Sequence, residues 1–143
     1  TDRRCESVEV ASDAGAVVSV KVRTEVSGVD LAEIAQEIDA AGADAIHVDA
    51  MDSEAVVADV VDAAPDLFVV ANNEVRDRES VREYLQYGAD AVSIGRPSTD
   101  ARVRRRVHRA VDEWFAETDR VERTDTAQNS GRTSGSHEEV DAQ

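Results

Sequence analysis

Short apolar runs alternate with amphipathic segments along most of the chain. Four runs are rich in β-branched residues and have the length of buried strands, at about 16–23, 45–48, 67–71 and 91–94. Apolar residues at helical spacing predict intervening helices at about 30–41, 54–64, 77–87 and 99–117. Residues 1–13 fit the tail of one more helix. This alternation is typical of βα units in a parallel sheet.

A short repeat marks each place where a helix ends and a strand begins. Ala-Gly-Ala-Asp-Ala-Ile at 41–46 recurs as Tyr-Gly-Ala-Asp-Ala-Val at 87–92, and Ala-Gly-Ala-Val-Val at 14–18 is a looser third copy. A doubly wound sheet usually has a Gly-rich turn after its first strand, and no G-x-G-x-x-G occurs in the chain. A (β/α)8 barrel takes about 250 residues. We therefore expect an α/β fold of the (β/α)8 TIM-barrel type, with about four βα units, the C-terminal half, in these 143 residues.

The polarity of the chain changes after Glu117. Residues 1–117 carry the periodic apolar pattern and are predicted to form the half-barrel. Residues 118–143 are acidic and polar with almost nothing apolar, so we predict a disordered tail there.

Composition narrows the class of protein. The formal net charge is −15, from 31 acidic and 16 basic residues, and Lys21 is the single lysine. This balance resembles that of proteins from salt-loving archaea, and it would repel nucleic acid unless salt is high or basic residues cluster. One cysteine, Cys5, excludes an internal disulfide and argues against a zinc or iron–sulfur site. With neither a secretion signal nor an apolar run that spans a bilayer, we expect a cytoplasmic protein without a membrane partner.

The predicted strand ends carry the candidate chemistry. In a barrel, reactive groups project from the carboxyl ends of strands, and phosphate commonly binds at the loops after the seventh and eighth strands. Those loops would be Asn72-Asn73-Glu74 and Gly95-Arg96-Pro97-Ser98, with Ser98 opening the next helix. The alternatives are an ordinary βα loop at Gly95 and a simple turn at Asn72-Asn73.

The two earlier strands add Lys21, Arg23, His47 and Asp49 to the candidates. We expect His47 and Asp49 on opposite faces of their strand, with Asp49 facing the barrel interior. Lys21 is predicted either to contact a ligand or to pair with a carboxylate such as Asp49, because a buried amine needs a partner.

Four motifs, in order and at suitable spacing, resemble the tRNA-dihydrouridine synthase family and its dihydroorotate dehydrogenase-like relatives. They lie at 18–24 (VSVKVRT), 42–46 (GADAI), 69–75 (VVANNEV) and 88–96 (GADAVSIGR), within roughly 14–100. The resemblance implies an FMN-dependent oxidoreductase that takes electrons from NAD(P)H and acts on a pyrimidine ring, uridine in tRNA. It implies that Lys21 reaches the flavin ring and that the loops at Asn72, Asn73, Glu74 and at Gly95, Arg96 hold its phosphate. Asp49 completes the predicted cofactor-binding set.

The chain also departs from the family pattern. The family usually has His-Gly-Arg where this chain has Asp49-Ala50-Met51, and Asn-Gly-Asp has become Asn72-Asn73-Glu74. The family's catalytic cysteine is expected upstream of this chain, since Cys5 lies too close to Lys21. The family's helical RNA-binding domain normally follows the barrel, and we expect no counterpart of it in the polar residues after Glu117. These departures favour an archaeal branch of dihydrouridine synthase-like or dihydroorotate dehydrogenase-like flavoproteins.

Several functional alternatives therefore stay open. The substrate is uridine in tRNA or a free pyrimidine, as in dihydroorotate or dihydropyrimidine dehydrogenases. A non-redox phosphate-binding barrel would use the same two loops, and a half-barrel could be inactive by itself because its sheet edges are exposed. The arginines at 102–109 form either a tRNA backbone contact or a solvated helix face.

Overall fold

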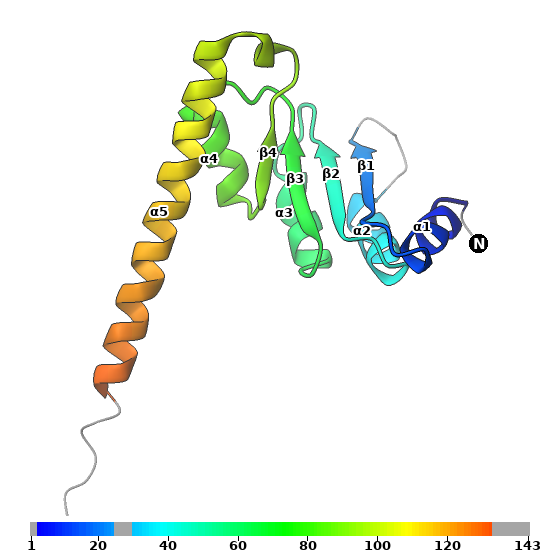
Figure 1. Ribbon diagram of the computed structural model, residues 1–143, viewed down its shortest axis with the longest axis horizontal. Helices are drawn as coiled ribbons and strands as arrows, with labels where there is room; N and C mark the ends of the chain where they lie inside the picture. The colour runs from blue at the N-terminus through cyan, green and yellow to red at the C-terminus, as the bar shows by residue number, and fades with distance from the viewer. Residues whose placement is uncertain (1–2, 25–29, 133–143) are drawn as a thin grey trace, which may run out of the picture.

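The computed structural model describes residues 3–24 and 30–132 and shows the predicted alternation of strands and helices (Figure 1). In chain order the elements are α1 (Arg3–Asp13), β1 (Ser19–Arg23), α2 (Leu31–Ala40), β2 (Ala45–Asp49), α3 (Val56–Ala63), β3 (Phe68–Asn72), α4 (Arg78–Gln86), β4 (Ala91–Ser93), the 3-10 helix η1 (Arg96–Thr99) and α5 (Ala101–Arg132). None of the helices in these ranges is long and apolar enough to cross a membrane.

The four strands form one parallel sheet in the order β1-β2-β3-β4. Sequential parallel strands joined by helices are the arrangement of a (β/α)8 barrel, and four of them make half of one. The predicted α/β class and partial TIM-barrel architecture are thereby confirmed.

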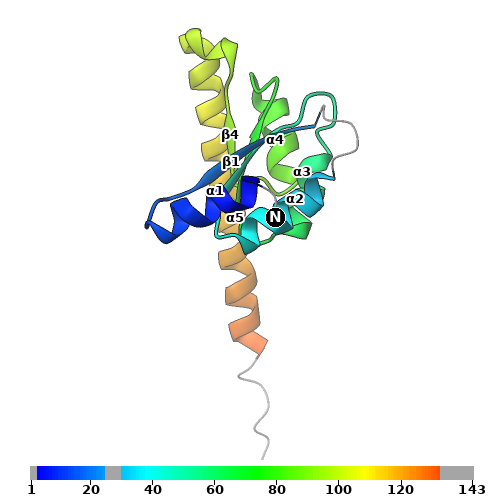
Figure 2. The ribbon, with the colours of Figure 1, turned by 90° about the vertical axis from the view of Figure 1, so that its right-hand side faces the viewer.

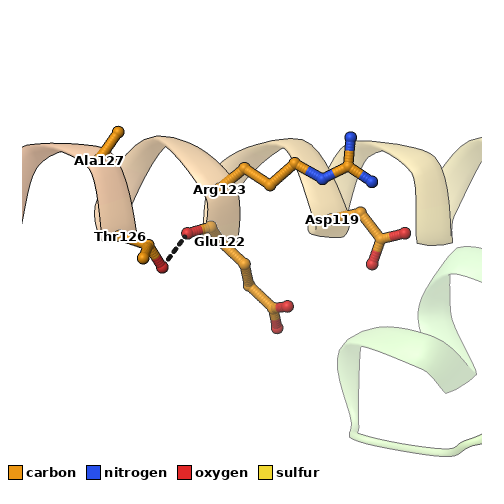
Figure 3. Close-up of a pocket in the computed structure, with 5 residues that line it drawn as sticks. All are labelled: Asp119, Glu122, Arg123, Thr126 and Ala127. Carbon is orange, nitrogen blue, oxygen red and sulfur yellow. Dashed lines mark hydrogen bonds between the residues drawn. The ribbon is translucent and has the colours of Figure 1, made fainter.

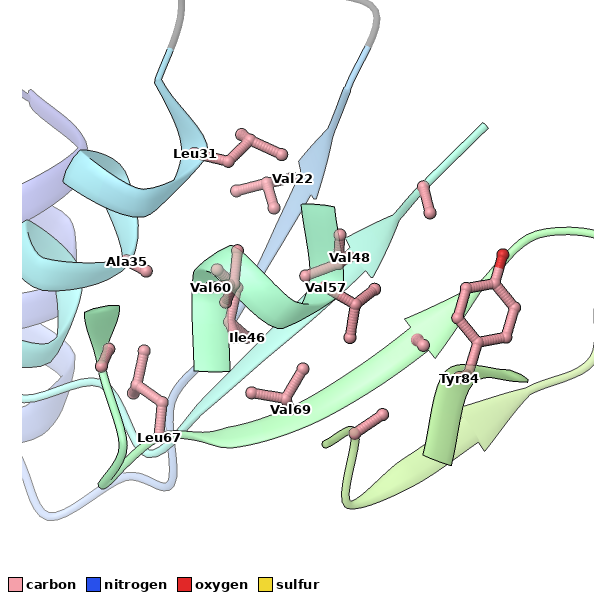
Figure 4. Close-up of a cluster of buried hydrophobic side chains, with 14 of the residues drawn as sticks. Val22, Leu31, Ala35, Ile46, Val48, Val57, Val60, Leu67, Val69 and Tyr84 are labelled. Atoms are coloured by element: carbon pink, nitrogen blue, oxygen red, sulfur yellow. The ribbon is translucent and has the colours of Figure 1, made fainter. Parts of the chain in front are cut away.

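The two faces of the sheet differ in what covers them. Alternate strand residues point toward the helices and are buried, among them Val22, Ile46, Val48, Val69 and Ala71. Figure 4 shows this core between the sheet and the helices α2 and α3, whose Leu31, Ala35, Val57 and Val60 pack into it. The intervening strand residues, on the opposite face, are mostly exposed or half-buried; Phe68 is 50% exposed. In a complete barrel that open face would line the interior.

The repeated Gly-Ala-Asp motif joins neighbouring strands at their amino ends. The carboxylate of Asp44 accepts a hydrogen bond from the backbone N–H of Val18 at 2.7 Å. Asp90 does the same for Val69 at 2.8 Å. The glycines at 42 and 88 have φ of +101° and +102°, which residues with a Cβ rarely adopt. The repeat is therefore a structural device that sets strand register.

The start of α5 corrects one expectation about capping. Asp30 caps α2 as predicted, its carboxylate accepting from the Ala32 N–H at 2.9 Å. Ser98, however, is not a cap: it lies inside η1, and its N–H donates to the Gly95 carbonyl at 3.0 Å. Asp100 caps α5 instead, accepting from the Arg102 N–H at 2.8 Å. Proline near the start of η1 has the φ that such a turn needs, which delays the helix.

Helix α5 is longer than predicted. It continues past Glu117 to Arg132, so the expectation of an unstructured chain from residue 118 is corrected for 118–132; residues 133–143 lie outside the described residues. Both ribbon views show the helix running well beyond the sheet (Figure 1 and Figure 2). Side chains at 118–128 are exposed, so this part is helical without packing on the core. Polar helix formers such as Arg and Glu allow this, and composition cannot separate such a helix from a disordered tail. The division into a barrel domain and a tail stays a prediction.

Candidate functional site

The carboxyl ends of the four strands bring most of the predicted site residues to one edge. Parallel register pairs Arg23 with Asp49, Asp49 with Asn72, and Asn72 with Ser93. Side chains paired in this way share a face of the sheet, and here it is the open face. One row deeper, Lys21 is paired with His47. The open face thus ends in a polar margin, which we call the strand-end row: Arg23, Asp49, Asn72 and Ser93.

The expectation that His47 and Asp49 lie on opposite faces is wrong. Residues two apart in a strand point to the same side. The charge of Asp49 raises the pKa of His47, and the charge of Lys21 lowers it, as groups near one another on one face would do. Burial is the largest influence and lowers the pKa of His47, so the neutral imidazole is favoured. Its Nε2 atom is buried and has no hydrogen-bond partner among the described residues.

Asp49 pairs with Arg23 and not with Lys21. Nε of Arg23 lies 3.6 Å from Oδ2 of Asp49, whose side chain is 12% exposed. Within residues 3–24 and 30–132, Lys21 forms no ion pair, and it is exposed on the open face. The structure therefore leaves the Lys21 ammonium available to a ligand.

The loop after β3 is held in an unusual conformation by its neighbours. Asn73 and Glu74 have φ of +127° and +51°. The side-chain amide of Asn73 donates to the Met51 carbonyl, and the hydroxyl of Tyr84 donates to the Asn73 carbonyl at 2.9 Å. Burial raises the pKa of Tyr84, which keeps this donor protonated. Asn73 is thus more than a solvent-exposed turn, and Tyr84, which no local motif indicates, supports the site from α4.

This conformation leaves backbone donors unpaired. At the other strand ends the next residue donates back to the neighbouring strand: Thr24 N–H to Asp49 at 3.2 Å and Ala50 N–H to Asn72 at 3.0 Å. Among the described residues, the corresponding N–H of Asn73 makes no hydrogen bond, nor do those of Glu74 and Gly95. We call these three N–H groups the amide cradle.

The amide cradle offers unpaired donors of the kind that a phosphate accepts from. A Cβ built on Gly95 would meet no atom within 4 Å, so open space lies over this backbone. The exposed Arg96 follows at the start of η1. Unpaired N–H groups beside a guanidinium suit an anion. The side chain of Glu74 is directed to Arg76, 3.2 Å away, so its contribution is its backbone.

Two hollows are poor candidates for a phosphate site. One adjoins the amide cradle at Asn73 and Glu74, between the loop after β3 and α4; its other lining residues are mainly acidic, including Glu54, Asp77 and Glu83, which would repel phosphate. The other, shown in Figure 3, is formed by Asp119, Glu122, Arg123, Thr126 and Ala127 of α5 alone. No cluster of three metal-ligating side chains occurs in the described part of the chain.

The arginines at 102, 104, 105, 106 and 109 are all exposed on α5. Arg104 donates to the Ser98 carbonyl. The pKa of Asp77 is lowered mainly by its hydrogen bonds with Ser80, and the charge of Arg106 adds a small effect in the same direction. Part of the cluster therefore stabilises the start of α5 and its contact with α4. Whether it also meets RNA stays a prediction.

Solved structures of other proteins are similar in fold to this chain. The chain resembles a cube-shaped, highly porous protein cage designed by fusing symmetric oligomeric domains, with a TM-score of 0.64 and 16% identity over 92% of this chain and 50% of that one. It also resembles 3-hexulose-6-phosphate synthase, with a TM-score of 0.54 and 18% identity over 74% of this chain and 55% of that one. At these identities the likeness concerns the fold alone, and the chain spans about half the length of each. No curated protein matches.

The family comparison covers nearly all of the chain. The family described as dihydrouridine synthase (Dus) matches residues 5–130, a range that includes every strand, the amide cradle and most of α5. The chain belongs to the dihydrouridine synthase family.

Proposed function

We propose that this chain provides the FMN-binding half of a dihydrouridine synthase that reduces uridine in tRNA. The observation that carries the proposal is the separation of two features along one sheet: the amide cradle after β3 and β4, and Lys21 on β1. β1 and β4 are three strand spacings of about 4.8 Å apart, or about 14 Å along the sheet. A ligand that bridges the two must be elongated, with a phosphate at one end, and FMN has this shape.

Different residues would bind the phosphate and the flavin ring of FMN. The N–H groups of Asn73, Glu74 and Gly95, with Arg96, would hold the phosphate. Lys21 would place its ammonium beside the flavin ring, where a positive charge tunes the ring's electronics. FMN, when bound, would supply the transfer of two electrons to or from a pyrimidine ring. NAD(P)H is the proposed electron donor.

The proposal also specifies the substrate, which is either uridine in tRNA or a free pyrimidine. Family membership supports uridine in tRNA, and the exposed arginines of α5 offer a contact for its phosphates. A free pyrimidine is the alternative, which the net charge of −15 supports because an acidic surface repels RNA. The arginine-rich, acidic composition further supports a salt-loving archaeal source, where screening would weaken that repulsion.

A non-redox function on a sugar phosphate is the second candidate, since the amide cradle alone would suit one. The fold likeness to 3-hexulose-6-phosphate synthase brings this possibility forward. Such a ligand has no need of a cation about three strands away from its phosphate.

The test is whether the purified protein carries flavin and what its loss changes in RNA. We expect yellow protein, with weaker flavin retention in Lys21→Ala. Dihydrouridine in tRNA should fall when the gene is deleted; unchanged dihydrouridine with bound flavin would point to a free pyrimidine. Colourless protein that binds a sugar phosphate but ignores added FMN would favour the non-redox candidate.

A further inference from the structure

Three residues of the strand-end row form an alternating set of hydrogen-bonding groups. Arg23, Asp49 and Asn72 stand in register on the adjacent strands β1, β2 and β3. Neighbouring strands lie about 4.8 Å apart, so three polar side chains follow one another across the face at that interval.

Asp49 is the acceptor in the middle of the set. The residue is 8% exposed, and among the residues that the structure describes it is the one charged residue that is buried. Its carboxylate has the Arg23 guanidinium 3.6 Å away, but no N–H or O–H among the described residues donates a hydrogen bond to it. A buried carboxylate without donors is costly, and it can only accept. A ligand that brings an N–H to this position would remove that cost.

The flanking residues are donors. Arg23 turns its Nε to Asp49, which leaves the outer nitrogens of a side chain that is 61% exposed. The half-buried Asn72 has no side-chain hydrogen bond to another described residue, so its amide N–H groups are available. Across the face, the row therefore offers donor, acceptor and donor.

We propose that Arg23, Asp49 and Asn72 recognise the imide edge of a uracil-type ring, in which an N–H lies between two carbonyl groups. Asp49 accepts from the N3–H, and Arg23 and Asn72 donate to the flanking carbonyl oxygens. The same edge occurs on the pyrimidine part of the flavin and on the uracil base of the substrate. The inference rests on the proposed function for its two ring sources, and on the strand-end row for its chemistry.

The experiment removes the N3–H from the ligand and the acceptor from the protein. Binding of FMN and of N3-methyl-FMN, and of uridine and 3-methyluridine, is measured with the purified protein. We expect the ring that occupies the row to bind about 10- to 100-fold more tightly than its methylated analogue, as for a hydrogen bond to a charged group.

Three variants locate the effect. Asp49→Asn should abolish most of the preference for the unmethylated ring. Asp52→Asn, which removes the same charge from an exposed position in the following loop, should keep it. Arg23→Gln should weaken the binding of the unmethylated ring and of its methylated analogue equally. This substitution removes a contact to a carbonyl oxygen of the ring and leaves Asp49, the acceptor for the N3–H, in place. Arg23 is largely exposed, so this substitution disturbs the packing of the core less than one at the buried Asp49.

Each outcome decides between the inference and the function on which it rests. Tighter binding of FMN than of N3-methyl-FMN assigns the strand-end row to the cofactor. Tighter binding of uridine than of 3-methyluridine assigns the row to the substrate. Selective uridine binding without FMN binding would keep the inference and overturn the flavin proposal. FMN binding with no N3–H preference on either pair would overturn the inference alone, and binding of neither ring would overturn both.

Discussion

Oδ2 of Asp49 lies 3.6 Å from Nε of Arg23, and this pair joins the carboxyl ends of β1 and β2. The family pattern usually places His-Gly-Arg after the second of these strands, where this chain has Asp49-Ala50-Met51. The structure shows that a guanidinium is present at this edge nevertheless, supplied by the neighbouring strand. Arg23 is therefore the arginine that this edge of the sheet presents to a ligand.

Gly95 and Gly88 lie in different environments and should respond differently to substitution. Gly95→Ala should fold normally, because a Cβ there meets nothing within 4 Å, but should weaken FMN binding by filling the amide cradle. Gly88→Ala should destabilise the protein by about 1–2 kcal/mol, since its φ is +102° and a Cβ would lie 3.0 Å from Val61. Chemical denaturation and flavin titration of both variants check this. Equal stability loss in both would contradict the assignment of Gly95 to binding.

The Gly-Ala-Asp repeat should matter for stability. Asp90→Ala removes the acceptor of the 2.8 Å hydrogen bond from Val69 and leaves that N–H without its side-chain partner. We expect a loss of about 1–3 kcal/mol in the free energy of unfolding. Asp66→Ala, on the exposed turn before β3, is the control and should change little. If the two variants unfold at the same denaturant concentration, the repeat does not act as described.

His47 should make the protein less stable in acid. Its folded pKa lies below the ordinary value of 6.5, so the unfolded chain binds a proton first as pH falls. The stabilising contribution is present above the unfolded pKa and is lost as pH falls through the folded pKa. Between a pH above this window and a pH below it, the His47→Gln variant should therefore lose less of its free energy of unfolding than the unsubstituted protein.

The same pKa depends on Lys21. Lys21→Met removes a positive charge that lowers the pKa of His47, so the pKa should rise in this variant. Imidazole titration by NMR measures it directly. An unchanged pKa would place Lys21 away from His47.

The acidic composition predicts stabilisation by salt. A net charge of −15 disfavours the compact state through repulsion, and at 1 M salt the screening length falls to about 3 Å. The melting temperature should rise from low salt to molar KCl. A melting temperature that falls over this range would argue against adaptation to high salt.

The helices and strands could be predicted from the sequence because the core-facing residues repeat with the period of each element. Ile34 and Ile38 of α2, or Val69 and Ala71 of β3, are buried where the pattern places them. The repeat around Gly42 and Gly88 likewise marks the turns into β2 and β4.

The features that differ from the predictions have different causes. The pairing of Arg23 with Asp49 follows from the register of β1 on β2, and no local motif encodes it. The strands VKVR and IHVD do carry a signal, since aligning their ends places opposite charges side by side. The face of His47 could have been assigned from strand alternation alone. The length of α5 could not, because its exposed part leaves no apolar pattern.

The central claim is that the amide cradle and Lys21 bind the two ends of FMN. It is tested most directly by titrating the purified protein with FMN and with riboflavin, which has the same ring and no phosphate. FMN should bind at least about tenfold more tightly than riboflavin, and Gly95→Val should remove that difference while the protein stays folded. Equal binding of FMN and riboflavin, or a preference for FMN that Gly95→Val leaves intact, would contradict the account.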